Sequence, residues 1–288
     1  MNRLLTLFAR AAGYLLALLP RRLSWLLGQS VGLLFYYLIP IRKGVARANL
    51  ATAFPDWTPA RRRRILRRTY RHYGVVLLDF LAIPAWVRRP EAIIRLDTSA
   101  LDTARRDDPG LILLTGHLGN WEMTVLAMGA GGWPMMPVVV AQRGWAMSIV
   151  RQTRAATGCV SIPWKAPARQ MLKHLRQGKY LGLAADQDAR RKGVWVTFFG
   201  QPSSRFKGGA TFHLSSGAPL LFMRCVLQGD HRYRIDFLPI STAGLSGDRP
   251  ADAQLLTQRF MDLLETEVRL HPEQYFWFHR MWKTKPVA

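Results

Sequence analysis

A histidine and a glutamate stand five positions apart where a short apolar run meets a predicted helix. The run at residues 111–114 predicts a buried strand, and Asn120 predicts the N-cap of the helix, with Glu122 in its first turn. A carboxylate that accepts a hydrogen bond from one imidazole nitrogen fixes the tautomer and leaves the other nitrogen as a general base. We therefore predict that His117 is the base and that Glu122 orients it, since a strand-to-helix turn can bring the two together.

A purely structural role for His117 is the alternative, because a His-x4-Glu spacing is common by chance. The position of His117 in the sequence pattern favours a catalytic role. The carboxyl end of a strand in an α/β pattern is the place where ligands usually bind.

Beyond residue 110, apolar runs alternate with helix-like segments. Strands are predicted at 111–114, 136–140, 159–162, 180–184 and 219–223, and helices at 148–157 and 168–177. A β-hairpin at 222–227 and 233–238 and an amphipathic helix at 252–270 follow. The alternation predicts an α/β fold with a central, largely parallel mixed sheet flanked by helices.

Two apolar segments, 4–19 and 23–39, open the chain. As helices each would be roughly 25 Å long, short of a hydrocarbon core of about 30 Å. Arg21 and Arg22 lie between them, which argues against a spanning hairpin under the positive-inside rule. We expect residues 1–41 to be a membrane-associating region with one tilted or partly inserted helix and one interfacial helix. Two ordinary core helices are the alternative.

The charge balance is strongly basic: 41 Lys and Arg against 18 Asp and Glu give a formal net charge of +23 over 288 residues. Such a charge predicts an acidic partner: nucleic acid, anionic lipid or an acidic protein. On a helix Arg61, Arg64, Arg68 and Arg71 form one stripe, which favours anionic headgroups, with a solvated face as the alternative. Because no nucleic-acid recognition motif is present, we expect no nucleic-acid partner.

The chain has two cysteines, Cys159 and Cys225, in predicted strands. Their spacing matches neither a zinc site nor a disulfide framework. We expect both to be small buried hydrophobic residues.

Three motifs carry a resemblance to a known family. The segment 116–122, Gly-His-Leu-Gly-Asn-Trp-Glu, resembles the His-x4-Asp/Glu motif of glycerolipid and lipid A acyltransferases. Asp186-Gln187-Asp188 with 194–200, and the ending at 277–286, resemble segments of the bacterial lipid A lauroyl/myristoyl acyltransferase family. The resemblance covers nearly the whole chain. The Phe-Pro-Glu-Gly-Thr-Arg motif of the phospholipid-making relatives is absent, which argues against the glycerol-phosphate branch.

This resemblance implies an acyltransferase domain over residues 42–288 and a location at the bacterial inner membrane, with the catalytic face in the cytoplasm. The implied reaction moves a fatty acyl group from a thioester, on acyl carrier protein or coenzyme A, to a hydroxyl of a lipid A precursor or related glycolipid. No metal or redox cofactor is expected. Lysophospholipid or ornithine-lipid acyl transfer is the alternative, and the intact His117 and Glu122 argue against a non-catalytic scaffold.

Further polar residues are candidates for the site. The resemblance implies an arginine that holds the donor carbonyl oxygen or a phosphate. Among Arg143, Arg151 and Arg154, the spacing of Arg154 from Gly158 matches best, with an exposed helix face as the alternative for each of the three. Asp186 and Gln187 end a predicted strand and are expected to orient the acceptor or His117, unless they only cap a turn. Five cationic residues are expected to bind phosphate or the carrier: Arg190, Arg191, Lys192, Arg205 and Lys207.

Overall fold

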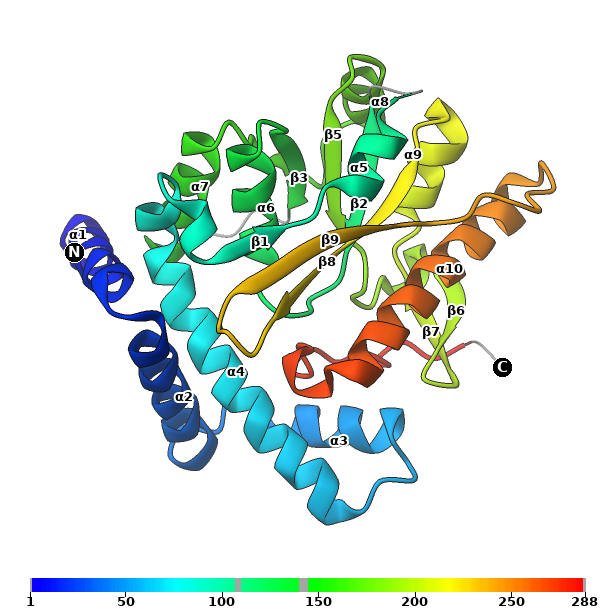
Figure 1. The fold of residues 1–288 in the computed structure, drawn as a ribbon. Helices are drawn as coiled ribbons and strands as arrows, with labels where there is room; N and C mark the ends of the chain where they lie inside the picture. Colours follow the sequence, from blue (N-terminus) through cyan, green and yellow to red (C-terminus); the bar gives the residue numbers. More distant parts are fainter. Residues whose placement is uncertain (1, 107–109, 140–144, 287–288) are drawn as a thin grey trace.

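The computed structural model describes residues 2–106, 110–139 and 145–286 (Figure 1). Within them the main sheet has the order β1-β9-β8-β2-β5-β3-β4. Its strands are β1 Ile94–Leu96, β2 Leu111–Thr115, β3 Met135–Val139, β4 Ile162–Pro163, β5 Tyr180–Ala184, β8 Leu220–Leu227 and β9 Tyr233–Pro239. Every pair is parallel except β8 with β9, which form the predicted hairpin. The predicted α/β class and largely parallel sheet are confirmed.

Helices cover both faces of this sheet. The α-helices of the described residues are α1 Asn2–Leu18, α2 Arg21–Tyr37, α3 Lys43–Ala53, α4 Pro59–Trp86, α5 Ser99–Ala104, α6 Trp121–Ala130, α7 Trp145–Ala156, α8 Ala168–Arg176, α9 Gly208–Ser216 and α10 Arg249–Leu270, of which α1, α2 and α3 pack on α4. Side chains alternate along a strand, so Ile112 and Leu114 of β2 enter a core with α8, α9 and α10. Leu111 and Leu113 enter a second core, with α6 and the end of α4. All five residues of β2 are buried, as expected for a central parallel strand.

The two N-terminal helices lie along α4, which runs down one side of the molecule (Figure 1). Small residues make the contact. A Cβ atom on Gly32 would lie 2.1 Å from the carbonyl oxygen of Tyr70, and one on Gly13 would lie 2.0 Å from that of Leu81. The large apolar residues therefore point outward, and Leu4, Phe8 and Leu18 are 73%, 74% and 75% exposed. This packing leaves an apolar face of α1 exposed.

None of the described helices is long and apolar enough to cross a membrane. Arg21, which separates the two apolar segments in the sequence, has a structural role. It forms an ion pair with Asp79 of α4 (2.5 Å), and Asp79 also accepts a hydrogen bond from Tyr233 of β9. Arg21 therefore fixes the start of α2 to the domain.

Some predicted elements need correction. The strand at 159–162 is reduced to β4, Ile162–Pro163, so Cys159 lies outside the sheet, although both cysteines are buried as expected. A separate hairpin, β6 Val194–Phe198 and β7 Gln201–Arg205, was not predicted from the sequence. The sequence of β7, Gln-Pro-Ser-Ser-Arg, lacks the alternating apolar residues that predict a strand. Among the strands of the described residues, β7 pairs only with β6.

Candidate active site

Sheet register brings His117 and Asp186 together. Strands β2 and β5 are parallel neighbours, and Thr115 pairs with Ala184, so each of the two residues lies two positions beyond its strand. The Nδ1 atom of His117 lies 2.7 Å from Oδ1 of Asp186, and the backbone N–H of His117 donates to Oδ2 at 2.9 Å. The carboxylate thus fixes both the ring and the backbone of the histidine.

Asp186 is ionised although it is fully buried. Burial alone would raise the pKa of this carboxyl, but His117 and the buried Arg205 outweigh it and bring the pKa down to about 2. Tyr275 adds a hydrogen bond from its hydroxyl to Oδ2 (3.1 Å). A carboxylate without a proton can only accept, so Nδ1 of His117 carries the hydrogen and Nε2 presents a lone pair.

A C-terminal segment closes over the histidine loop. The N–H of Phe276 donates to the carbonyl of His117, and the N–H of Gly119 donates to the carbonyl of Gln274, both at 2.9 Å. The hydroxyl of Tyr73, on α4, lies 3.1 Å from the same carbonyl of His117. The C-terminal segment, α4 and Asp186 after β5 therefore all hold this loop, and all three are distant from it in sequence.

The free side of the imidazole faces aromatic rings and one amide. The ring of Trp121 meets the imidazole edge-on at 4.5 Å between centroids, and that of Phe276 lies at 6.0 Å. The side-chain nitrogen of Gln187 is 3.2 Å from Nε2 and donates to it. His117 keeps 16% of its side chain exposed, so Nε2 is accessible once Gln187 yields its place.

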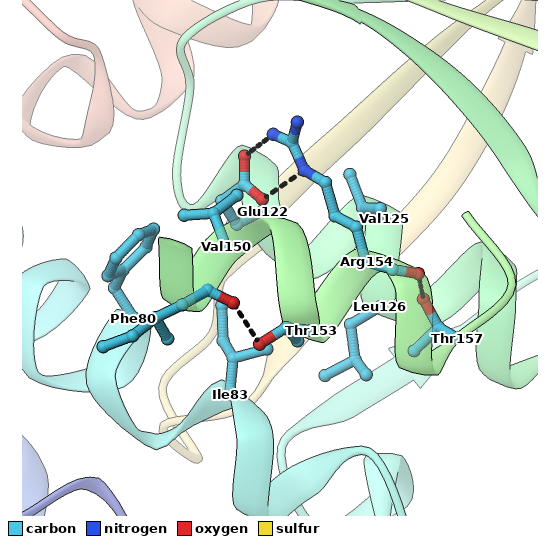
Figure 2. Close-up of a pocket in the computed structure, with 10 residues that line it drawn as sticks. Phe80, Ile83, Glu122, Val125, Leu126, Val150, Thr153, Arg154 and Thr157 are labelled. Carbon is cyan, nitrogen blue, oxygen red and sulfur yellow. Dashed lines mark hydrogen bonds and ion pairs between the residues drawn. The ribbon is translucent and has the colours of Figure 1, made fainter. Parts of the chain in front are cut away.

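Glu122 does not contact the imidazole in this arrangement. Its carboxylate forms a two-point ion pair with Arg154, whose Nε lies 3.1 Å from Oε2, and Arg154 also donates to Ser161 (2.9 Å). Figure 2 shows the two side chains bonded directly to each other, and both line a small cavity between α4, α6 and α7. The predicted contact of Glu122 with His117 is thus replaced by two separate pairs, because Glu122 in the first turn of α6 points toward α7.

The same pairing changes the expectation for Arg154. Arg154 is 8% exposed. Its guanidinium is bonded to Glu122 and Ser161 and therefore does not point toward the imidazole. Arg143, the second candidate, lies outside the described residues.

The cationic candidates divide into two groups. Arg190, Arg191 and Lys192 form an exposed 3₁₀ turn two residues beyond Asp188, and Lys207 is exposed before α9. Arg205 is different: it is completely buried in β7, where its Nη1 donates to the carbonyl of Met281 (3.0 Å). The expectation that Arg205 binds a phosphate from a surface loop is therefore wrong, because its side chain points into the core beside Asp186.

Tyr73 and Tyr275 were missed by the sequence analysis. Neither lies near His117 in the chain, and each looks like an ordinary core aromatic. Only the resemblance of the ending at 277–286 indicated that the C-terminal segment matters, and the contacts begin just before it.

Comparisons with known proteins identify the family of the chain. The model of the bacterial lipid A biosynthesis acyltransferase family matches residues 2–284. The chain is 27% identical to a lipid A biosynthesis palmitoleoyltransferase of Escherichia coli K12, over 99% of this chain and 92% of that protein. It is 24% identical to the lauroyltransferase of the same organism, over 95% and 89%. A phosphatidylinositol mannoside acyltransferase of Mycobacterium tuberculosis is 28% identical over 63% and 57%.

A histidine whose Nε2 can accept a proton is suited to acyl transfer. The family match extends over nearly all of the chain. The chain is an acyltransferase and belongs to the bacterial lipid A biosynthesis acyltransferase family.

Proposed function

We propose that this protein transfers a fatty acyl group from a thioester donor to a hydroxyl of a lipid A precursor or a related glycolipid. The observation that carries the proposal is the hydrogen bond of 2.7 Å between Nδ1 of His117 and the buried Asp186. That bond leaves Nε2 as the proton acceptor on a partly exposed face. The names of the relatives support the class of acceptor.

The proposed reaction begins when the acceptor hydroxyl displaces Gln187 from Nε2 of His117. As Nε2 takes the proton, the hydroxyl oxygen attacks the thioester carbonyl and forms the new C–O bond. The tetrahedral intermediate then breaks its C–S bond, and the imidazolium returns the proton to the departing thiolate. Asp186 stabilises the imidazolium by its negative charge, and no acyl-enzyme is needed.

We assign stabilisation of the oxyanion to the start of α6 rather than to Arg154. The ring of Trp121, the first residue of α6, packs on the imidazole, so the positive end of the helix dipole lies beside the reacting atoms. Arg154 is neutralised by Glu122 and serves to fix α7 against α6.

A direct assay tests the proposal. Purified full-length protein is incubated with a lipid A precursor and either acyl carrier protein or coenzyme A as the acyl carrier, and the lipids are analysed by mass spectrometry. We expect a mass increase of one acyl group, placed on oxygen. Release of free fatty acid with no acylated lipid would contradict the proposed transfer.

We further propose that α1 and α2 rest on the bacterial inner membrane, with the site on the cytoplasmic side. Their outward leucines and phenylalanine are the support for this orientation. Arg61, Arg64 and Arg68 of α4 are exposed and suited to anionic headgroups, whereas Arg71 bonds to Gln29 of α2.

Replacing Phe8 and Leu15 by asparagine should lower membrane binding about 100-fold, because each buried side chain of this size contributes about 1.5–3 kcal/mol. Both lie on one face of α1, 74% and 66% exposed, so the fold should be retained. Flotation with anionic vesicles measures the change. Val160 and Leu270, also exposed and outside α1 and α2, provide the matched control pair. Equal binding of both double variants and the unchanged protein would refute the proposed face.

For the donor, we propose an acidic carrier protein that docks on the turn Arg190–Lys192. Reversing all three charges to glutamate should raise the KM for the acyl carrier protein about tenfold or more, and that for acyl coenzyme A much less, since a wide basic face steers a protein partner. The kcat should change little, because these residues lie outside the histidine pair. Steady-state kinetics with both donors at two salt concentrations measures this. An equal rise for both donors would exclude the docking role.

A further inference from the structure

A second cavity, of about 500 Å³, lies between α3, the β6–β7 hairpin and the C-terminal residues 280–286. It is open to solvent at its basic residues, because Arg280, Lys283 and Lys285 are all exposed. This cavity shares no lining residue with the one beside Glu122 and Arg154.

The lining is cationic without compensation. Arg280, Lys283 and Lys285 contribute three positive charges, and no aspartate or glutamate lines the cavity. Among the described residues none of the three forms an ion pair with a carboxylate. Three cationic side chains around one hollow with no carboxylate in its lining give it a positive potential, which favours a multivalent anion.

Polar groups in the same lining can complete such a site. Thr52 of α3 and Gln201 of β7 offer a hydroxyl and an amide. Trp282 also lines the cavity, and its indole N–H is buried with no hydrogen-bond partner in the described part of the chain. Because that nitrogen is buried, Trp282 contributes apolar ring surface to the wall of the cavity.

The C-terminal segment that lines the cavity is also hydrogen-bonded to the residues that follow β5. Thr284 donates to Asp188 through its N–H (2.8 Å) and its hydroxyl (2.7 Å), two residues beyond Asp186. At the other end of the segment Tyr275 bonds to Asp186 itself. The residues that carry the cations therefore belong to the segment that holds the histidine pair.

We propose that this cavity binds a phosphate ester of a substrate, with Arg280 and Lys283 as its principal ligands. The guanidinium and ammonium groups supply charge-assisted hydrogen bonds to phosphate oxygens. The phosphate belongs either to the headgroup of the acceptor lipid or to the phosphopantetheine arm of the donor. This proposal rests on the proposed acyl transfer for the identity of the substrate, but not for binding of phosphate itself.

Binding is tested first, without catalysis. Full-length protein in detergent is titrated with inorganic phosphate and followed by ³¹P NMR line broadening. The variant R280Q/K283Q should raise the Kd for phosphate at least about tenfold, because it removes two charge-assisted hydrogen-bond donors. The matched control is K173Q/R176Q, which removes an exposed lysine and arginine with the same spacing on α8. Equal Kd values for the two double variants would overturn the proposal, whether or not acyl transfer is observed.

Kinetics then identify the source of the phosphate. If it belongs to the acceptor, R280Q/K283Q raises the KM of the phosphorylated acceptor about tenfold but not that of a phosphatase-treated acceptor. If it belongs to the donor, the KM rises for acyl-phosphopantetheine but not for a phosphate-free acyl-N-acetylcysteamine. Either result supports the site. Unchanged KM values for all four substrates, in an enzyme with normal activity, would show that the cavity takes no substrate phosphate and would overturn the proposal.

Discussion

Replacing His117 by alanine is expected to lower kcat/KM for acyl transfer by about 10²–10⁴-fold, the usual contribution of a general base. The imidazole is the group whose Nδ1 is bonded to Asp186 and whose Nε2 faces the open side. The fold should survive, because the loop is held through the backbone: His117 N–H still donates to Asp186, and its carbonyl still accepts from Phe276. Initial rates over a range of acceptor concentrations and thermal unfolding of the same preparation measure the two effects.

His213 provides the matched control for this variant. It is a partly buried histidine of α9, and its Nδ1 lies 2.9 Å from the carbonyl of Ala218. His213→Ala should lose some stability but keep activity within a few-fold of the unchanged protein. If His117→Ala kept comparable activity, His117 would not be the base.

The order of strands and helices was readable in the sequence where hydrophobic periodicity is strong. The runs at 111–114 and 180–184 became β2 and β5, and the hairpin at 222–227 and 233–238 became β8 and β9. Hydrophobic periodicity did not predict the strand that forms through pairing with a neighbour instead of through burial of an apolar face. Residues 201–205 are polar, and they form β7 only because β6 lies antiparallel to them. Sequence periodicity carries no information on such a partner.

The site shows the same limit more sharply. The position of His117 at a strand end predicts it as a site residue, but the sequence pattern predicts Glu122, five positions away, as its carboxylate partner. Asp186 is 69 residues away and becomes adjacent only through the register of β2 with β5. Glu122 is close in sequence, but the first turn of α6 directs it to Arg154 on α7. A rule that side chains at the ends of adjacent parallel strands converge would have found the pair, had the strand order been known.

Asparagine at position 186 should abolish activity nearly as fully as loss of His117, with a fall in kcat/KM of about 10²–10⁴-fold. The backbone N–H of His117 and the hydroxyl of Tyr275 both donate to Oδ2 of Asp186, so they will keep the amide oxygen of an asparagine on their side. Its NH₂ group then faces Nδ1, where it can only donate. The histidine must take the tautomer with hydrogen on Nε2, which removes the base from the reacting side.

Glu122→Gln is the informative comparison for Asp186→Asn. It breaks the ion pair with Arg154, whose side chain is 9% exposed, and should cost about 3–5 kcal/mol in the free energy of unfolding. Because the pair does not touch the imidazole, kcat/KM of the folded fraction should fall much less than in Asp186→Asn. Activity normalised to folded protein, with unfolding followed by urea denaturation, separates the two variants. The reverse ranking would return the orienting role to Glu122.

The pH dependence of stability gives an independent check on Asp186. Its folded pKa, about 2, lies below the ordinary value of 3.8, so the carboxylate contributes stability above pH 3.8 that is lost as pH falls toward 2. The free energies of unfolding of the unchanged protein and Asp186→Asn should therefore differ most near neutral pH and converge below pH 3.8. Across pH 5–8 the carboxylate stays ionised, so the acid limb of the activity profile cannot arise from Asp186. A stability difference that grew as pH fell would show that Asp186 is protonated in the folded protein, and the proposed orientation of His117 would fail with it.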